Sequence, residues 1–431
     1  MILAAVGFLV VFAMIFMRVP VAVALMAVGT AGMAWSMGTK LALASLALTF
    51  KETTLAYTLS VIPLFILMGN IVGRSGLAEE LYDSARAVVG RFRGGLAFAT
   101  ILSCGGFAAV SGSSVATAVT MSQVAVPEMR RRGYSDRLAT GAIAAGGTLG
   151  ILIPPSVIMV IYGVSTETHI GKLFAAGLIP GLLGMLGYCG AIAWTIRRNP
   201  EAAPEGQRVS REAALRAFAR IWAVLLLFLV VVGGIYGGFM TPTEAAGIGA
   251  SCSLLISLVR RKLTWPLFAR IMMESAATTA GIFAILIGAT VFAEFMNFTG
   301  AHKGVLALVR DGGLPPWAVI AVILAIYLVL GCVLESLSMM LLTIPLFFPV
   351  VTGLGYDPVW FGIIVVMVVE IGLITPPFGM NLFVLRSVVP DVPLTTLYRG
   401  VLPFAVADLF RLLLLAVFPA ISLLLPGLLF N

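Results

Sequence analysis

The sequence has few charged residues for its length. Of its 431 residues, 11% are Asp, Glu, Lys or Arg, whereas 60% are hydrophobic. A soluble domain carries about 25% charged residues. A chain this apolar could not hide its hydrophobic surface from water in a soluble fold. The composition therefore predicts an all-α membrane protein that crosses the lipid bilayer many times.

Residues that build catalytic and metal centres are also scarce. The two histidines, His169 and His302, cannot form a metal site by themselves, and the sequence has no Ser/His/Asp arrangement. It also lacks a Gly-rich loop ending in Lys-Ser or Lys-Thr, so we expect no ATP hydrolysis on this chain. We therefore expect neither an enzyme nor a bound cofactor. The cysteines lie far apart in apolar segments and predict no disulfide framework: Cys104, Cys189, Cys252 and Cys332.

The net charge of +8 does not indicate a nucleic-acid-binding protein. The basic residues cluster in short loops, as the positive-inside rule describes for the cytoplasmic loops of membrane proteins. The chain begins with apolar residues at Ile2, without a basic segment or a small-residue cleavage site. We therefore expect a first membrane helix rather than a signal peptide.

Apolar segments of about 20 residues, the length that spans a bilayer, recur along the chain. They lie near 2–17, 20–38, 55–73, 172–196, 221–240, 243–259, 275–298 and 396–425. Amphipathic segments lie near 77–90 and 302–310. The other apolar segments are either interrupted by small polar residues, at 95–126 and 317–351, or broken by Pro-Pro, at 135–165 and 357–388.

A polar stretch, 197–220, divides the chain into two similar halves. Eight prolines lie at or before Pro204, and five of them fall on another proline when 222 is added to the residue number. Chance would rarely produce this with 22 prolines in 431 residues. The sequence therefore predicts two copies of one unit, 1–196 and 221–431, joined by a cytoplasmic linker at 197–220.

The basic residues also predict how the two units are oriented. Arg91 and Arg93 precede the first interrupted stretch and Arg130–Arg132 follow it, whereas the second stretch has no Lys or Arg at either end. We therefore expect two re-entrant hairpins, one from the cytoplasm at about 95–130 and one from the periplasm at about 317–353. Five crossings plus one hairpin invert the second unit relative to the first and leave both termini periplasmic. Inverted repeats with discontinuous helices are typical of transporters.

The Pro-Pro segments predict two discontinuous helices, at 135–165 and 357–388. In "GGTLGILIPPS", Pro154 and Pro155 remove two N–H donors, and the glycines permit unusual dihedral angles and close approach. Unpaired backbone is tolerated at membrane depth only where it lines a cavity or is buried in protein. We expect the freed carbonyl oxygens to coordinate a small cation, and we expect the same of "GLITPP" from the opposite side.

The centres of the two hairpins carry oxygen ligands. In "SGSSVAT", residues 111–117, Gly112 allows a chain reversal, and the hydroxyl and carbonyl oxygens suit Na⁺. The helix that follows offers its N-terminus to a substrate carboxylate. The alternative is that these small residues only allow close helix packing. In the second hairpin, Ser336 matches Ser114 at the same offset, and Glu335 is an ion ligand, a proton carrier or an acceptor of backbone N–H groups.

Two further polar residues lie close to the second break. Glu370 precedes it and either serves the ion site or pairs with a basic or amide group between domains. Asn381 follows it at the start of a helix, where its amide either contacts substrate or is a satisfied buried amide. The sequence leaves both choices open.

Two long motifs carry a resemblance to a known family. "SGSSVATAVTMSQVAVPEMRRRGYSDRLATGAIAAGGTLGILIPPSVIMVIYGV" and "GIIVVMVVEIGLITPPFGMNLFV" resemble the large membrane subunit (DctM-type permease) of tripartite ATP-independent periplasmic (TRAP) transporters. The resemblance implies an elevator-type importer of organic acids in the bacterial inner membrane, coupled to Na⁺. It also implies two partners, a small four-helix membrane subunit and a periplasmic substrate-binding protein. The family commonly has Asp at the position of Glu335.

The resemblance also implies the site residues. Sodium ligands are expected at Ser111, Gly112, Ser113, Ser114, Thr117, Gly147, Thr148, Gly150, Glu335, Ser336, Gly372 and Thr375. Substrate contacts are expected at Ser113, Ser114, Pro154, Pro155, Ser336, Pro376, Pro377 and Asn381. Two other functions stay open at this point: a stand-alone sodium- or proton-coupled dicarboxylate carrier of the same architecture, and a membrane-embedded enzyme or channel.

Overall fold

The computed structural model describes residues 2–206 and 211–430, and these residues form helices and connecting loops without a β-strand. Residues 207–210 of the expected 197–220 linker, and both terminal residues, lie outside the described residues. The linker and the periplasmic position of the termini therefore stay predictions.

The helices follow one another with short connections. The first half contains α1 (Ile2–Phe16), α2 (Val21–Met37), α3 (Thr39–Leu55), η1 (Tyr57–Ser60), α4 (Val61–Gly73), α5 (Leu77–Val89), α6 (Gly95–Ser111), α7 (Ser114–Arg131), α8 (Asp136–Thr148), η2 (Leu149–Ile151), α9 (Val157–Ser165) and α10 (Ile170–Arg198). The linker contains η3 (Pro200–Ala202) and α11 (Arg211–Arg220), and the second half contains α12 (Trp222–Phe228), η4 (Leu229–Gly233), α13 (Gly234–Tyr236), α14 (Pro242–Val259), α15 (Trp265–Thr299), α16 (Ala301–Asp311), α17 (Pro316–Gly331), α18 (Ser336–Gly353), α19 (Pro358–Ile374), α20 (Met380–Val388), α21 (Leu394–Val417) and α22 (Ala420–Leu429).

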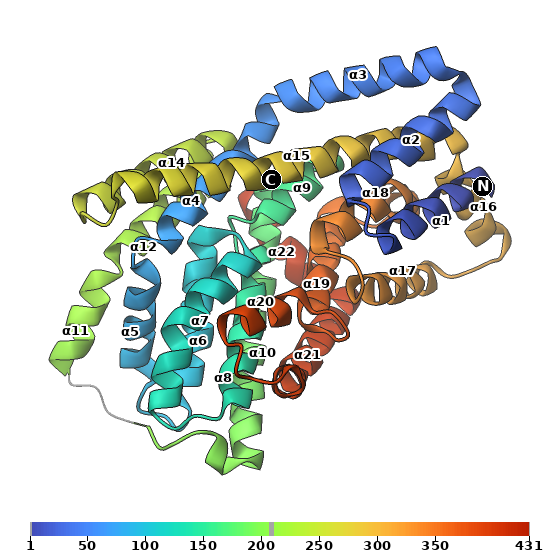
Figure 1. Cartoon of the computed structure of the whole chain (residues 1–431). Helices are drawn as coiled ribbons and strands as arrows, with labels where there is room; N and C mark the ends of the chain where they lie inside the picture. The colour runs from blue at the N-terminus through green and yellow to red at the C-terminus, as the bar shows by residue number, and fades with distance from the viewer. Residues whose placement is uncertain (1, 207–210, 431) are drawn as a thin grey trace.

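The long helix α15 organises one side of the molecule. It packs along α2 and also contacts α3 and α4, while α14 packs against α4 (Figure 1). Glycines bring the α2 and α15 backbones together: a Cβ added at Gly288 would lie 2.5 Å from the Ala22 carbonyl oxygen, and one at Gly29 would lie 2.9 Å from the Val291 carbonyl oxygen. Small residues allow this close helix packing in membranes. We call α1–α4, α14 and α15 the scaffold.

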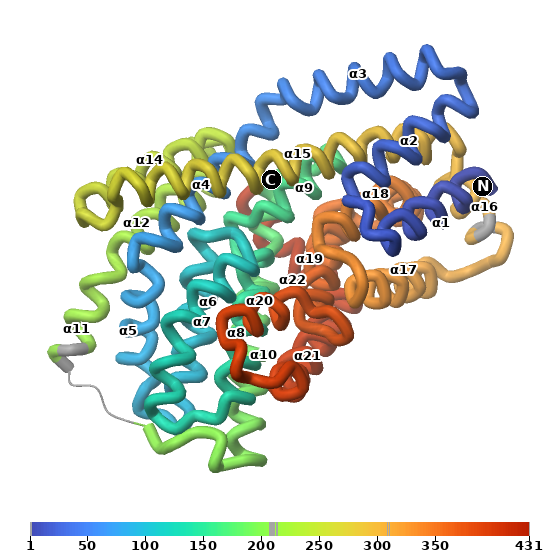
Figure 2. Tube along the Cα trace, in the orientation of Figure 1, coloured from blue at the N-terminus to red at the C-terminus, as the bar shows by residue number. Residues whose placement is uncertain are grey.

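A second group of helices surrounds α19. Helices α8, α10, α18 and α21 all contact it, and the chain trace shows the two halves of the sequence interleaved there (Figure 2). Every residue of α19 from Val359 to Ile374 is buried. A helix that is apolar on nearly all sides lies either in a protein core or in lipid, and here protein surrounds it. This helix is the core around which both broken segments are arranged.

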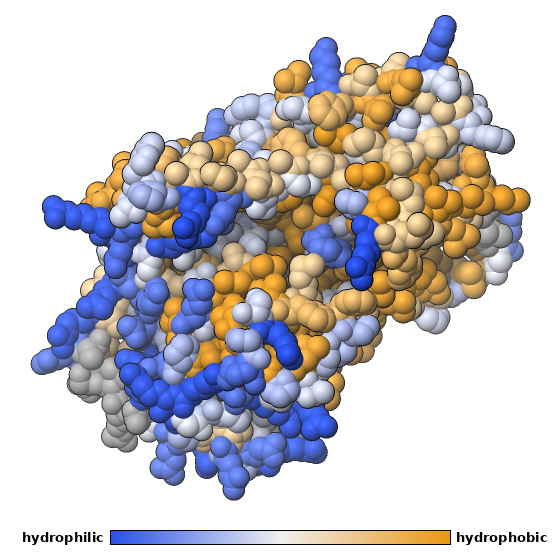
Figure 3. Space-filling view, in the orientation of Figure 1, coloured by the Kyte–Doolittle hydropathy of each residue, from blue (hydrophilic) through white to orange (hydrophobic). Residues whose placement is uncertain are grey.

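The surface separates into polar and apolar regions. Hydrophilic residues gather at the lower left of the view, around α11 and the lower ends of α5–α8 and α10, and apolar residues cover much of the remaining face (Figure 3). Among the described residues, five helices are long and apolar enough to span a membrane, or up to seven if each bent pair is one span. Shorter apolar helices add to these, including Ile2–Phe16, Val21–Met37 and Pro358–Ile374. The chain is a multi-pass membrane protein.

The predicted irregular segments are irregular in the structure. The stretch 95–126 contains two helices separated at Gly112, and 317–351 contains two helices separated at 332–335. Each Pro-Pro segment holds two helices with non-helical backbone between them. The amphipathic segments form α5 and α16. Whether the two hairpins are re-entrant stays a prediction.

One helix was missed and one expected span was wrong. No element was expected at 39–55, because Lys40, Lys51 and Glu52 lower its hydropathy; this segment forms α3 and bends by 53° into η1 and α4. The expected span 396–425 is divided into α21 and α22 at Phe418. Proline disfavours the α conformation in the residue before it, and Phe418 precedes Pro419.

Two glycines of α15 give a matched test of the scaffold packing. Gly288→Ala should destabilise the protein by about 1–3 kcal/mol, since the new methyl group meets backbone that cannot move aside. Gly281 lies on an exposed part of the same helix with nothing within 4 Å of an added Cβ. Gly281→Ala should stabilise by about 0.5–1 kcal/mol, because alanine loses less entropy in a helix. Thermal unfolding in detergent measures both, and equal shifts would contradict the packing described.

Candidate functional site

The first tip is the reversal between α6 and α7. Gly112 ends α6 with φ of 62°, a left-handed conformation that glycine adopts without strain. The Ser113 side chain caps α7 and accepts a hydrogen bond from the backbone N–H of Ala116 at 3.3 Å. The hydroxyls of Ser111 and Thr117 lie 2.9 Å apart, and Thr117 also donates to the Ser113 carbonyl oxygen at 2.7 Å. Oxygen atoms are therefore concentrated in this tip.

The first tip rests directly on the first break, by which we mean residues 147–156 between the regular parts of α8 and α9. A Cβ added at Gly150 would lie 2.6 Å from the Ser113 carbonyl oxygen, and one at Gly147 would lie 3.2 Å from the Ser114 carbonyl oxygen. From the tip side, a Cβ at Gly112 would lie 2.6 Å from the Pro155 carbonyl oxygen. The expected close approach is therefore present. The expected unusual dihedral angles are not, since Gly146, Gly147 and Gly150 all lack a positive φ.

The second tip is the reversal between α17 and α18, at residues 332–335, and a carboxylate there caps α18. Glu335 is the N-cap of α18 and accepts hydrogen bonds from the Ser338 backbone N–H at 3.1 Å and the Ser338 hydroxyl at 3.2 Å. Of the roles that the sequence left open, accepting a backbone N–H is thus observed. The second break packs on the end of α17, where a Cβ at Gly372 would lie 2.7 Å from the Gly331 carbonyl oxygen. Thr375 donates to the Ile371 carbonyl oxygen at 2.6 Å.

The two tips line one cavity of about 360 Å³, which we call the tip cavity. The first tip contributes residues 111–116 and the second contributes Glu335 and Ser336. Ser114 and Ser336 are separated by 222 residues, and each begins the helix that follows its tip. Neither hydroxyl has a hydrogen-bond partner within the described chain. Both are therefore available to a ligand.

The scaffold and both broken segments complete the walls. Asn70 of α4 and Thr278 of α15 line the tip cavity, so polar scaffold groups also face it. Glu335 is the only charged residue among its lining residues. A neighbouring cavity of about 330 Å³ lies between the second tip and the second break, and Glu335, Ser336 and Gly372 all line it.

The other predicted site residues lie outside the tip cavity. Thr117, Gly147 and Gly150 lie behind the first tip, Gly372 lines the neighbouring cavity, and Thr375 lies on the second break. Pro154 and Pro155 are buried, whereas Pro376 and Pro377 are exposed, and both Pro-Pro bonds are cis.

Asn381 is fully buried, and its amide donates to the Ala144 carbonyl oxygen at 3.2 Å. It therefore joins the second broken segment to α8. The side-chain carbonyl oxygen of Asn381 is buried without a hydrogen-bond partner among the described residues, so the contact matches the satisfied-amide alternative only in part and a substrate contact stays a prediction.

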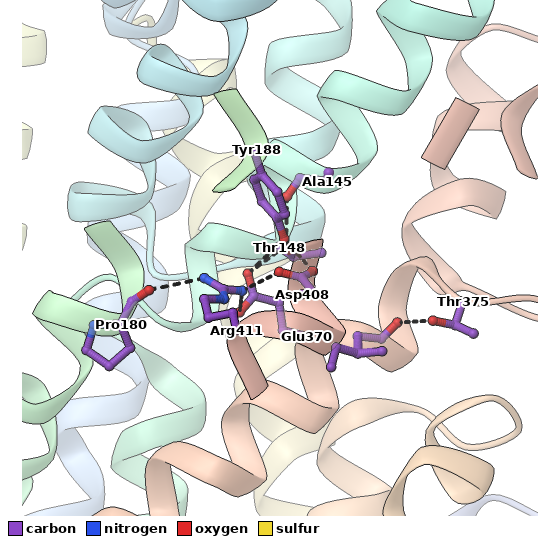
Figure 4. Close-up of polar contacts among 9 residues, drawn as sticks. Ala145, Thr148, Pro180, Tyr188, Glu370, Thr375, Asp408 and Arg411 are labelled. Atoms are coloured by element: carbon purple, nitrogen blue, oxygen red, sulfur yellow. Dashed lines mark hydrogen bonds and ion pairs between the residues drawn. The ribbon is translucent and has the colours of Figure 1, made fainter. Parts of the chain in front are cut away.

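Thr148 belongs to a buried cluster that the sequence only partly predicted. Its hydroxyl lies 2.8 Å from a Glu370 carboxylate oxygen, and Glu370 pairs with the Arg411 guanidinium at 2.8 Å (Figure 4). Arg411 also binds Asp408 at 2.6 Å, and the Tyr188 hydroxyl donates to Asp408 at 2.6 Å. We call these five residues the charge cluster. Thr375 lies apart from it (Figure 4).

Sequence reasoning identified Glu370 and Thr148 but missed the other three members. Pairing of Glu370 with a basic group was one of its two alternatives, and Arg411 is that group. The signal that was available is "ADLFRLLLL", in which Asp408 and Arg411 lie one turn apart in an apolar segment. Charged residues at membrane depth are expensive and are therefore functional candidates.

Two ion pairs outside the membrane segments link the start of the first broken region to the loop after the second. Arg130, at the end of α7, binds Asp136 at 2.6 Å and Asp391, which follows α20, at 2.7 Å. The hydrogen bond from Arg130 lowers the pKa of Asp391.

Two glycines with positive φ provide a test of the contact between tip and break. Gly112→Ala and Gly133→Ala both place alanine in the left-handed region, which costs about 1–2 kcal/mol. An added Cβ meets the Pro155 carbonyl oxygen at Gly112 but nothing within 4 Å at Gly133. We expect the Gly112 variant to unfold at lower temperature and to lose transport, and the Gly133 variant to keep transport. If both keep transport, the contact does not matter for function.

The comparisons with known proteins agree over nearly the whole chain. The family model described as "Tripartite ATP-independent periplasmic transporter, DctM component" matches residues 8–421. The C4-dicarboxylate TRAP transporter large permease protein DctM of Pseudomonas aeruginosa is 41% identical over 385 residues, which are 89% of each chain. The sialic acid TRAP transporter large permease protein SiaM of Vibrio cholerae is 36% identical over 379 residues, 86% of this chain and 87% of that protein.

Two further matches extend the comparison. The isethionate TRAP transporter permease protein DctMQ of Oleidesulfovibrio alaskensis is 36% identical over 377 residues, 86% of this chain but 58% of that longer protein. The YdaH transporter of Alcanivorax borkumensis shares the fold, with a TM-score of 0.64 over 89% of each chain at 18% identity. These relatives are transporter permeases rather than enzymes. The chain belongs to the DctM component family, the large permeases of tripartite ATP-independent periplasmic transporters.

Proposed function

We propose that this chain imports an organic acid with Na⁺ across the bacterial inner membrane, after a periplasmic binding protein delivers the acid. A small four-helix membrane subunit completes the complex. The observation that carries the proposal is the tip cavity, in which residues 111–116 and residues 335–336 line one space. Segments more than 200 residues apart in the sequence therefore share a site large enough for a small molecule.

The chemistry of the tip cavity supports an acidic substrate accompanied by a cation. Helices α7 and α18 both begin at its wall, and helix N-termini attract anions; that of α18 is already capped by the Glu335 carboxylate, whereas that of α7 is capped by the neutral Ser113. The described residues that line the cavity include no Lys, Arg or His, so a carboxylate there would depend on the N-terminus of α7 and on bound cations for its neutralisation. Glu335 in the same wall adds negative charge and favours a cation further. The relatives carry names of acids: a C4-dicarboxylate, sialic acid and isethionate.

The contact between the first tip and the first break supports a sodium site. The Ser113 and Ser114 carbonyl oxygens and the Thr117 hydroxyl approach the backbone of Gly147 and Gly150 so closely that an added Cβ would lie only 2.6–3.2 Å from them. Such hard, uncharged oxygens are suitable ligands for a small hard cation. Because residues 147 and 150 are both glycine, no side chain lies between the first break and the oxygens of the first tip.

The positions of the helices support an inverted repeat. Helices α7 and α18 differ by 222 residues at both ends, and α9 and α20 differ by 223. An inverted pair of hairpins would present one tip from each side of the membrane to the same site. Movement of both tips and both breaks as one body would keep the ligand oxygens together, which favours an elevator mechanism. Scaffold residues Asn70 and Thr278 line the cavity at the surface along which this body would slide.

Sodium coupling can be tested on the two equivalent serines. Purified complex in liposomes should accumulate the acid only when an inward Na⁺ gradient is present. Ser114→Ala and Ser336→Ala should each raise the Na⁺ or substrate concentration for half-maximal uptake by about fivefold, the effect of one lost hydrogen bond. Ser251→Ala, at an exposed hydroxyl on α14, is the control and should change neither. Uptake that follows a proton gradient and ignores Na⁺ would contradict the proposal.

Topology can be tested with single cysteines in a cysteine-free background. Leu314→Cys lies in the exposed loop before α17, and Arg131→Cys lies at the end of α7. We expect an impermeant maleimide to label position 314 from the periplasm and to reach position 131 only after the membrane is permeabilised. The reverse pattern, or labelling of both from one side, would rule out the inverted hairpins.

A further inference from the structure

The charge cluster lies behind the first break and does not touch the tip cavity. Glu370, Asp408 and Arg411 have side chains that are 0%, 1% and 4% exposed, and they come from α19 and α21. Thr148 is the last residue of α8, and Tyr188 comes from α10. A buried group of charges on four helices needs a reason to persist, because apolar residues would be easier to bury there.

The surrounding residues are shaped to hold the Arg411 guanidinium in one place. It donates to the Pro180 carbonyl oxygen of α10 at 3.2 Å, in addition to binding both carboxylates. A Cβ added at Gly184 would collide with the guanidinium, so glycine at this position makes room for it. The rigid, planar guanidinium can serve several acceptors at fixed angles, which the lysine ammonium cannot do.

The cluster joins the two breaks to each other. Thr148 and Glu370 are 222 residues apart, the offset that relates the two halves, and their side chains meet at 2.8 Å. Thr148 lies between Gly147 and Gly150, whose backbone faces the oxygens of the first tip. The Thr148 hydroxyl points away from that tip, toward Glu370 and Tyr188. A displacement of Glu370 would therefore be transmitted through Thr148 to the backbone of the first break.

The cluster also contains more negative than positive groups. Two carboxylates face one guanidinium, and Tyr188 and Thr148 supply only neutral donors. An uncompensated charge in a dry interior is costly, and its interaction with a nearby opposite charge is strong there. When both carboxylates are ionised, a cation at the first break would provide the compensating positive charge.

We propose that Glu370, held by Arg411 and Asp408, is a positioning residue for the sodium site at the first break. It fixes Thr148 and thereby the carbonyl oxygens of residues 147–150, and its carboxylate favours a cation beside them. This inference rests on the proposed sodium coupling. In this arrangement the Thr148 hydroxyl does not bind the ion itself. It holds the backbone of the first break in place, and the carbonyl oxygens of that backbone are the ligands.

The test compares two carboxylate-to-amide variants in the complete complex. Glu370→Gln keeps an acceptor for Thr148 but removes the charge. Glu294→Gln is the matched control, because Glu294 also accepts from two hydroxyls, those of Ser45 and Thr49, but lies in the scaffold helix α15. We expect Glu370→Gln to raise the Na⁺ concentration for half-maximal uptake by about tenfold or more, the size seen when residues supporting metal ligands are changed. Glu294→Gln should leave it unchanged.

Two more variants leave every carboxylate in place. Gly184→Ala displaces the Arg411 guanidinium. Arg411→Lys keeps the positive charge but loses the planar group that donates several hydrogen bonds at fixed angles. Both should shift the Na⁺ dependence in the same direction as Glu370→Gln, with a smaller change in the maximal rate at saturating Na⁺. Sodium-dependent thermal stabilisation of the purified complex gives a second readout of ion binding that does not require transport.

The outcomes separate this inference from the proposed function. If wild-type uptake and thermal stability ignore Na⁺, the proposed sodium coupling fails and the inference fails with it. If the wild type responds to Na⁺, but Glu370→Gln, Gly184→Ala and Arg411→Lys lose thermal stability and keep the wild-type Na⁺ dependence, the cluster only stabilises the fold. That result would overturn the inference alone.

Discussion

Backbone polar groups must find partners at membrane depth, and the arrangement of this protein follows from that constraint. Lipid offers no hydrogen bonds, so non-helical backbone can exist there only against other protein or at a polar cavity. The first break meets this requirement by direct contact with the first tip, through glycines that let the two backbones approach. The second break packs on the end of α17 in the same way. Each irregular segment is therefore paired with another one.

This pairing brings together the oxygen atoms of the candidate site, but the two breaks differ in their exposure to solvent. Pro154 and Pro155 are buried, whereas Pro376 and Pro377 are exposed beside the second tip. The serines that begin α7 and α18 face one cavity, and the scaffold forms part of its wall. The Pro-Pro of the first break is therefore covered by protein, whereas that of the second break is open.

The sequence predicted the features that depend on local chemistry. Glycine and Pro-Pro identify the tips and breaks because their effect on the backbone does not depend on distant residues. It predicted only Glu370 and Thr148 of the charge cluster, because Tyr188, Asp408 and Arg411 lie in apolar helices and meet only through tertiary packing. Asn381 could equally have faced substrate or a carbonyl group, and only the fold distinguishes the two. The division at Phe418 was readable from Pro419 but was obscured by the apolar residues around it.

The proposed transport site lies between the two tips. The most direct measurement is an experimental structure of the assembled complex with Na⁺ and a transported acid bound. We predict density for the acid between Ser114 and Ser336 in the tip cavity, and for Na⁺ where the first tip meets Gly147 and Gly150. Ligand density elsewhere, with the tip cavity empty under conditions that support transport, would contradict the account.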